Sequence, residues 1–408
     1  MRLRLAHENL GEFMSRWGKF RTLGLALALL LPVFTMSGGA GASKAASGKP
    51  IQIGLVVSTT GLGAVYGVDQ RAGADLAAKM INAAGGINGH PIKIDFENDN
   101  YTPATTQSAY AQILANNSVI GIIGPTSSSS ALSADPLAVA AKVPVLAISN
   151  GAIGIPQIGT YVHRVGVPEP ELQPIVARDV IRHFKITSAA IIYASDNPFG
   201  VTGYNAYSQA LKSEGATITN VQSYLSASTV DFTPQLQTIA SGHPQLLFVA
   251  AVSNEGATIV QEANQLGMKV VMVGNLAFTS SALIKIAGSA ANGLLTGATW
   301  TSKDPGKLNQ VFVSKYQAAY GRPASPIAAT AFNAVYIVKQ ALSHSSSYTR
   351  ASLQKGLNAM KAYHFVGEPV NFVSVGGGFR DAKTAEPDIL QAENGSLVPF
   401  CSGVSCSK

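Results

Sequence analysis

The stretch INAAGGINGHPIKIDFENDN (81–100) joins a helix pattern to a strand pattern through a turn rich in glycine and asparagine. Residues 64–84 carry apolar side chains at helical spacing, and Gly85 and Gly86 end that pattern, as glycines beyond a helix C-terminus do. PIKIDFEND predicts a strand, and Asn88-Gly89 can supply the positive φ values of the turn before it. This order indicates a helix that returns to a parallel sheet.

The same alternation fills most of the chain. IQIGLVV (51–57) predicts a buried strand before the turn, and further strands are predicted at 119–124 and 143–149 with helices between them. The pattern restarts after a proline-rich segment (160–174). Strands are then predicted at 189–195, 216–224, 245–252 and 269–274, again separated by helices, and followed by helices at 308–321, 328–344 and 352–360 and a hairpin at 370–382. The fold class is therefore α/β, with two doubly wound lobes in sequence.

The first residues predict export. Residues 1–21 are basic, LGLALALLLPVF is apolar but too short for a permanent membrane span, and small residues follow. We expect a signal peptide and leader over residues 1–45, cut near Ala42 or Ala45, and a periplasmic location; an uncleaved membrane anchor is the alternative. The net charge of +7 falls to +4 without residues 1–42, and no basic stripe indicates nucleic-acid binding.

The cysteines and histidines predict no metal site. Cys401 and Cys406 lie in the tail, residues 401–408, where an oxidising compartment favours a disulfide; two unpaired thiols are the alternative. The seven histidines are scattered and form no metal-ligand motif. The glycines of TTGLGAVYG (59–67) do not have dinucleotide-binding spacing, and no Walker A motif occurs. No cofactor is predicted.

GPTSSSSALS (124–133) is the strongest local indication of a ligand. It places the hydroxyls of Ser127 and Ser128 and free backbone N–H groups at a predicted helix N-terminus, which favours an anionic group. Helix capping by serine alone is the simpler alternative. A serine hydrolase is less favoured, because no G-x-S-x-G motif occurs.

Open α/β sheets bind ligands beyond the carboxyl ends of their strands, so two facing lobes predict a cleft between them. The strand-end loops that would line this cleft are 58–67, 124–130 and 148–152 in the first lobe and 195–201, 250–256 and 274–279 in the second.

These residues resemble the leucine/isoleucine/valine-binding family of periplasmic solute-binding proteins of ABC importers, which have the type I periplasmic binding protein fold. The resemblance covers about residues 51–378, and three of the segments that carry it are IQIGLVVSTTGLGAVYG, VIGIIGPTSSSSALSADPLAVAAKVPVLAIS and YASDNPFGVTGYNAYSQALKSEGATI. It implies two lobes joined by a three-stranded hinge. Residues 51–167 and 298–370 would form lobe 1, and residues 168–297 and 371–400 would form lobe 2, so that the final hairpin returns to lobe 2.

The resemblance also implies binding residues. The family's carboxylate-holding serine falls at Ser127, its aromatic over the ligand at Tyr66, and its loop contacts after the fourth strand at Asn150 and Ala152. In the second lobe, the aromatic that closes on the ligand falls at Phe199.

Some family positions carry different residues in this sequence. Val252 stands near the place of a tyrosine, and Leu276 at the place of the acid that holds an amino acid's ammonium. The cysteines of a disulfide common in the family fall at Tyr101 and Thr126.

A buried ammonium without a carboxylate partner costs several kcal/mol, and Phe199, Val252, Leu276 and Phe278 make the second lobe apolar. Glu255 lies nearby in sequence, but an acid in the first turn of a helix is also expected from the helix dipole. We therefore expect a solute-binding protein for a small apolar amino acid, an amide, or an organic or aromatic acid. A sensory module of the same fold is the alternative. The expected partners are the permease and ATPase subunits of an ABC importer, and the protein is expected to be a monomer.

Overall fold

A computed structural model describes residues 46–226, 228–252, 254–384 and 386–402, all within one compact unit, Ser43–Lys408. The predicted leader and Cys406 lie outside these residues, so the cleavage site and the Cys401–Cys406 disulfide stay predictions. No helix in the described part of the chain is both long and apolar enough to cross a membrane.

The glycine-rich turn after Ala84 has the predicted form. α1 (Ala64–Ala83) ends before Gly85 and Gly86, which both have positive φ, as do Asn88 and Gly89. The Asn82 side chain then accepts from the Ile92 N–H (2.7 Å) and donates to the Ile92 carbonyl (2.8 Å). These two bonds fix the end of the helix to the start of β2, so the chain enters the sheet in a defined register.

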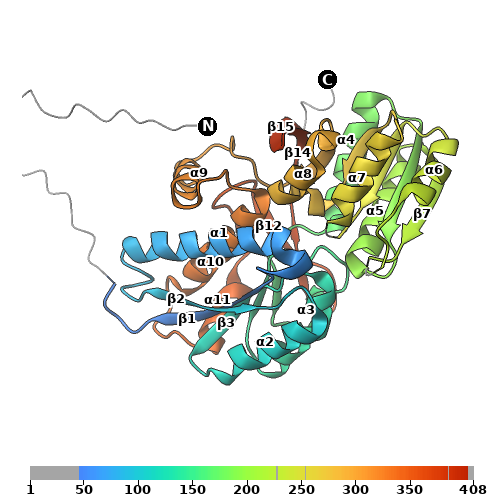
Figure 1. Ribbon diagram of the computed structural model, residues 1–408. Helices are drawn as coiled ribbons and strands as arrows, with labels where there is room; N and C mark the ends of the chain where they lie inside the picture. Colours follow the sequence, from blue (N-terminus) through green and yellow to red (C-terminus); the bar gives the residue numbers. More distant parts are fainter. Residues whose placement is uncertain (1–45, 227, 253, 385, 403–408) are drawn as a thin grey trace, which may run out of the picture. The chain divides into compact units, whose positions relative to one another are not determined.

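The first sheet is parallel throughout, in the order β2-β1-β3-β4-β5. Its strands are β1 (Ile51–Val57), β2 (Ile92–Asn98), β3 (Val119–Ile123), β4 (Val145–Ala147) and β5 (Val162–Arg164). Its helices are α1, α2 (Pro103–Ala115), α3 (Ser128–Ala140), α9 (Lys307–Tyr320), α10 (Pro326–Leu342) and α11 (Arg350–Ala359). Leu55 packs in a core with α1 and α10, whereas Val56 packs in a core with α2 and α3, so helices cover both faces (Figure 1).

The second sheet has the order β15-β14-β10-β9-β8-β6-β7. Its strands are β6 (Ser188–Ala194), β7 (Thr217–Tyr224), β8 (Leu246–Ala250), β9 (Val271–Gly274), β10 (Leu295–Ala298), β14 (Asp388–Glu393) and β15 (Ser396–Ser402). Its helices are α4 (Glu169–Phe184), α5 (Pro198–Ser213), α6 (Thr233–Ser241), α7 (Glu255–Gln265) and α8 (Ser281–Ala287). Phe248 packs with α4 and α5, and Val249 packs with α6, α7 and α8, so this sheet is also doubly wound. The predicted fold class is confirmed.

The predicted hairpin exists, but it does not join the second sheet. β12 (Val370–Ser374) pairs with β13 (Arg380–Lys383) on one side and with β11 (Ala362–Tyr363) on the other, in a separate three-stranded sheet. The Tyr363 hydroxyl donates to the Val165 carbonyl (2.7 Å), just after β5, and buried Arg164 pairs with Asp381 (3.0 Å). These contacts hold the hairpin against the first sheet, and the chain returns to the second sheet only at β14. The expectation that all of residues 371–400 belongs to lobe 2 is therefore wrong for the hairpin.

Three segments carry the chain between the two large sheets. They follow β5, β10 and β13, and the three-stranded hinge is therefore present. One close backbone approach on the first sheet depends on glycine. A Cβ at Gly67 in α1 would overlap the backbone of Ser58, which directly follows β1. The first turn of α1, which carries Tyr66, is thereby held close to the end of β1.

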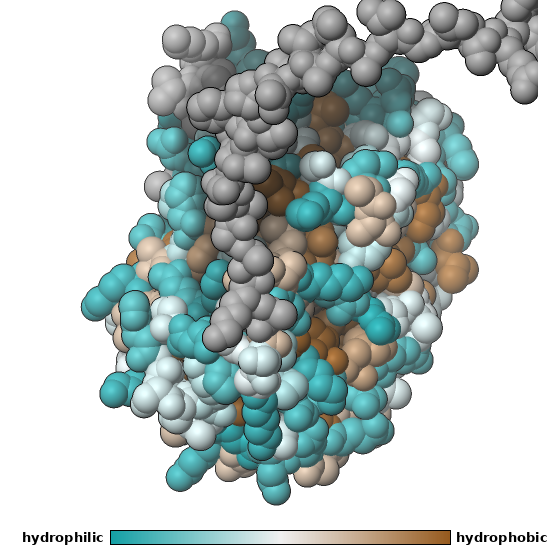
Figure 2. Space-filling model, turned by 90° about the vertical axis from the view of Figure 1, so that its left-hand side faces the viewer, coloured by the Kyte–Doolittle hydropathy of each residue, from teal (hydrophilic) through white to brown (hydrophobic). Residues whose placement is uncertain are grey.

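The surface drawn in Figure 2 has hydrophobic side chains interspersed among hydrophilic ones. Large hydrophobic residues that are exposed elsewhere, such as Ile153 and Val230, are scattered. Scattered exposure of this kind is normal for a globular protein and does not by itself indicate a binding surface.

Candidate functional site

A cavity lies where the carboxyl ends of the two large sheets face each other. Its volume is about 90 Å³, counted as the space open to the centre of a water-sized sphere. A water needs roughly 10–15 Å³ by this measure, so the cavity has room for a solute of roughly six to nine non-hydrogen atoms. The lining residues are Tyr66, Tyr101, Thr126, Ser127, Ser128, Ile148, Ser149, Asn150, Gly151, Gly166, Val167, Asn197, Phe199, Val252, Leu276, Ala277, Thr279, Ala298, Thr299, Pro326, Ile327 and Thr330.

The N-terminus of α3 forms the polar wall. Ser127 is its N-cap: the Ser127 Oγ accepts from the Ser130 N–H (3.0 Å). The first N–H groups of a helix have no intrahelical partner and carry the positive end of its dipole. Capping by Ser127 is therefore confirmed, and it occupies the Ser130 N–H. The predicted contact of an anion with the other N–H groups is compatible with this cap and stays a prediction.

Two buried polar atoms of the lining residues lack a hydrogen-bond partner among the described residues. They are the Tyr66 hydroxyl and the Asn150 Oδ1. The Asn150 Nδ2 donates to the carbonyls of Pro125 (3.1 Å) and Ser127 (2.9 Å), and this holds the amide in place. Such an unsatisfied buried group costs about 1–3 kcal/mol, and a bound solute could relieve the cost.

Apolar side chains form the opposite wall. Tyr66, Ala277 and Ile327 belong to one buried cluster, against which Tyr101 and Phe199 pack. The rings of Tyr66 and Tyr101 lie 6.2 Å apart in a tilted arrangement. A solute with an anionic end and an apolar body therefore fits this cavity.

Hydrogen bonds cross the cavity from one lobe to the other. The Tyr101 hydroxyl donates to the Val252 carbonyl (2.6 Å), and the Ser280 hydroxyl donates to the Val65 carbonyl (2.5 Å). The first bond joins the segment after β2 to the segment after β8, and the second joins the start of α1 to the start of α8. Both bonds therefore hold the two lobes together.

The lining residues carry no side-chain charge. Two acids nevertheless lie near the cavity. Glu255 starts α7, and its charge contributes, after burial, to raising the pKa of Tyr66 and Tyr101. Buried Glu169 accepts from the Leu276 N–H (3.0 Å) and from Gln173 (2.8 Å), and burial raises the pKa of its carboxyl to about 7 despite these bonds. Glu169 thus connects the start of α4 to the loop after β9.

Seven of the eight predicted ligand-binding residues line the cavity. They are Tyr66, Ser127, Ser128, Asn150, Phe199, Val252 and Leu276. Ala152 does not: it is fully buried behind Ser128, to whose Oγ its N–H donates (3.3 Å). Phe278, expected in the apolar wall, packs instead against Gly274 and Gly256 in the core of the second lobe. Contact of the seven residues with a ligand stays a prediction.

Other lining residues were not predicted. Tyr101 entered only as the place of a disulfide cysteine, although an aromatic residue just after β2 belongs to the same strand-end edge as Tyr66. Pro326, Ile327 and Thr330 come from the start of α10, which packs beside α1. No local pattern signals them, because α10 reaches the cavity only through tertiary packing.

The hydrolase alternative gains no support from this geometry. Among the described residues, those lining the cavity include no histidine or carboxylate that could take a proton from Ser127. The Ser127 hydroxyl is instead engaged in helix capping.

Known proteins share this sequence pattern and fold. The sequence model of a family described as "Periplasmic binding protein" matches residues 50–382. The Leu/Ile/Val-binding protein homolog 3 of Brucella melitensis is 23% identical over 362 residues, which cover 85% of this chain and 93% of that protein.

Two solved structures illustrate the range of the fold. The branched-chain amino acid transporter substrate-binding protein LivJ from Streptococcus pneumoniae, in complex with isoleucine, matches with a TM-score of 0.79 and 20% identity, covering 87% of this chain and 99% of its own. A solute-binding protein of an ABC transporter from Rhodopseudomonas palustris, in complex with 3,4-dihydroxybenzoic acid, matches with a TM-score of 0.76 and 22% identity, covering 87% and 98%.

Proposed function

The chain belongs to the periplasmic binding protein family, and from this premise we propose that it binds a small apolar carboxylate between its lobes and delivers it to an ABC importer. The observation that carries the proposal is the cavity itself. The start of α3 offers N–H groups to an anion, two lining residues carry unsatisfied polar atoms, and a buried apolar cluster forms another part of the lining.

The absence of side-chain charge in the lining favours a solute without an ammonium group. A carboxylate is stabilised there by the α3 N–H groups and their dipole without a cationic side chain. An ammonium in the same cavity would need a carboxylate, and Leu276 offers none. Burial of an unpaired ammonium costs several kcal/mol. Benzoates and branched aliphatic acids meet these requirements in size and charge.

A branched-chain amino acid is the second candidate, and Glu255 is the observation that favours it. Its charge acts on Tyr66 and Tyr101, which both line the cavity. If the loop after β8 shifts on binding, the Glu255 carboxylate could approach an ammonium. The two candidates thus differ in whether Glu255 contributes to affinity.

Isothermal titration of the chain with matched solutes separates them. Leucine and 4-methylpentanoate share a carboxylate and a side chain and differ only in the ammonium, and benzoate against methyl benzoate tests the carboxylate. We expect 4-methylpentanoate or benzoate to bind more tightly than leucine. We also expect Glu255→Gln to leave the affinity for these carboxylates unchanged. Tight binding of leucine that Glu255→Gln abolishes would establish the amino acid instead. Equal affinities for benzoate and methyl benzoate would contradict the proposed role of the solute carboxylate in binding.

Delivery to a permease is supported by family membership. Solute would shift the lobes toward the closed form, which docks on the membrane partner as a monomer. Uptake of the radiolabelled solute by cells that lack the gene tests this role. Uptake should be lost, whereas retained uptake with an altered transcriptional or chemotactic response would indicate the sensory alternative.

A further inference from the structure

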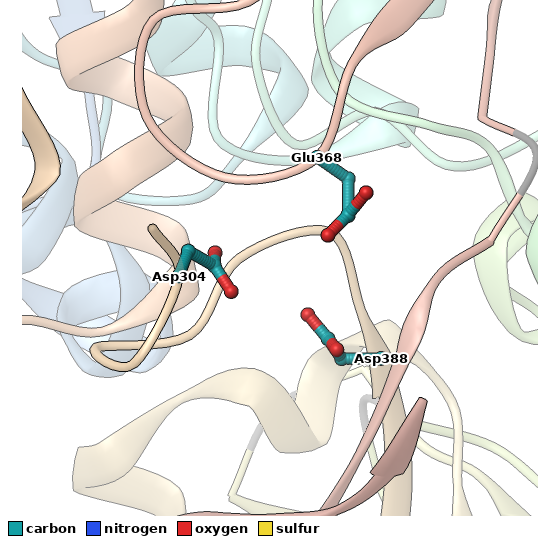
Figure 3. A group of neighbouring side chains, drawn as sticks. All are labelled: Asp304, Glu368 and Asp388. Atoms are coloured by element: carbon teal, nitrogen blue, oxygen red, sulfur yellow. The ribbon is translucent and has the colours of Figure 1, made fainter. Parts of the chain in front are cut away.

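Three carboxylates from distant parts of the chain converge away from the lining of the solute cavity. Asp304 follows β10, Glu368 lies between β11 and β12, and Asp388 begins β14. One oxygen of each lies within 4.8 Å of an oxygen of the others. Figure 3 shows the three carboxylates directed toward a common space. The sequence does not predict this grouping, because no spacing pattern links the three residues.

No basic side chain in the described part of the chain forms an ion pair with any of the three. The Asp304 carboxylate accepts from the Thr301 N–H (2.7 Å) and hydroxyl (2.8 Å). Asp388 is only 7% exposed, and its Oδ2 has no hydrogen-bond partner among the described residues. A buried carboxylate oxygen that faces two other carboxylates lacks a counter-charge.

The electrostatics agree with this geometry. Burial, followed by the charges of Asp304 and Glu368, raises the pKa of Asp388 to about 7. Burial also raises the pKa of Asp304 and Glu368, and the nearby His364 lowers it by a smaller amount. The like charges are thus held together at a net cost, which a bound cation would remove.

We propose that Asp304, Glu368 and Asp388 bind one Ca²⁺ ion. Carboxylate oxygens are ligands for hard cations. Two ligands of one Ca²⁺ can lie up to about 5 Å apart, twice the usual metal–oxygen distance, whereas two ligands of one Mg²⁺ can lie only about 4.2 Å apart. The three carboxylate oxygens all lie within 4.8 Å of one another, which is within this reach for Ca²⁺. Mg²⁺ keeps several waters and is usually held by only one or two carboxylates, so we expect it to bind more weakly here.

The position of this site gives the ion a structural role. The segments that carry Asp304 and Asp388 are two of the three that connect the large sheets. The Glu368 N–H donates to the carbonyl of Thr299 (2.8 Å), and Thr299 lines the solute cavity. The ion would thus fix the hinge segments to one another next to the cavity wall.

Calorimetric titration of the chain with CaCl2 after EDTA treatment, combined with thermal unfolding, tests the proposal. We expect one Ca²⁺ per chain and a rise in Tm that exceeds the rise with the same concentration of MgCl2. Asp388→Asn should abolish the calcium response. The same variant should unfold at a higher temperature than the original chain in EDTA, because one of three like charges is removed.

Asp231→Asn is the matched control, since Asp231 is an exposed acid outside the cluster. It should keep the full calcium response. Absence of calcium binding by the original chain, an equal response to Mg²⁺, or stoichiometric calcium binding that survives Asp388→Asn would each overturn the proposal.

Discussion

Replacing Tyr66 by phenylalanine separates a binding role from a structural one. The Tyr66 hydroxyl is buried, lines the cavity and has no hydrogen-bond partner among the described residues. The substitution removes this hydroxyl and keeps the ring that packs against Tyr101. Solute affinity should therefore fall, whereas the solute-free protein should lose no stability, because no internal hydrogen bond is broken.

The size of the loss depends on what the hydroxyl contacts. A neutral hydrogen bond contributes a net 0.5–1.5 kcal/mol, or about a 2- to 12-fold change in Kd. A bond to the solute carboxylate contributes about 1.5–3 kcal/mol, or roughly a 10- to 150-fold change. The measured factor therefore indicates which end of the solute lies against Tyr66.

The assay is isothermal titration with the tightest-binding solute, combined with calorimetric unfolding of the solute-free protein. Tyr207→Phe is the matched control. The Tyr207 hydroxyl is also buried and has no hydrogen-bond partner within the described ranges, but it lies outside the cavity lining, and its ring stacks on Phe248. It should leave Kd unchanged. An unchanged Kd in Tyr66→Phe would refute the reasoning, and so would a loss of unfolding free energy as large as the loss of binding free energy.

Three further predictions concern closure, pH and packing. Tyr101→Phe removes the bond to the Val252 carbonyl that crosses the cavity, so Kd should rise by about 2- to 12-fold, and small-angle scattering should show less compaction at a given solute concentration. Burial raises the pKa of Asp135 to about 8, above its value in the unfolded chain, so the free energy of unfolding should fall between about pH 4 and pH 8, by up to about 1.4 kcal/mol per pH unit. Asp135→Asn should flatten the pH dependence of the free energy of unfolding measured in denaturant titrations. An unchanged pH dependence would contradict the raised pKa of Asp135. Gly67→Ala places a Cβ against the Ser58 backbone and should lower the free energy of unfolding by about 1–3 kcal/mol, whereas a neutral effect in urea unfolding would show that the approach is not tight.

The sequence predicted those parts of the fold that local chemistry determines. Gly85 and Gly86 end α1, as expected, because glycine adopts positive φ without steric cost. The buried strands were predictable because apolar runs of this length suit a sheet covered on both faces. Strand order was not predicted. The hairpin predicted at 370–382 was assigned to lobe 2, because its partner strand β11 has only two residues and leaves no strand pattern in the sequence.

The site was predictable where a residue follows a strand. Loops 58–67, 124–130 and 195–201 were predicted to line the cleft because the carboxyl ends of parallel strands meet at one edge. Within these loops, the family resemblance indicated Tyr66, Ser127 and Phe199, and all three line the cavity. Ile327 and the carboxylate cluster could not be predicted, because tertiary packing alone brings them to their neighbours. Ala152 was misplaced because one peptide step beyond Gly151 turns the chain behind Ser128.

A crystal structure of the chain with its tightest-binding carboxylate tests the central claim most directly. We expect the solute carboxylate to lie within hydrogen-bond distance of the N–H groups at the start of α3, and the apolar body to lie between Tyr66 and Phe199. A carboxylate held by the second lobe, or a solute bound outside this cavity, would contradict it.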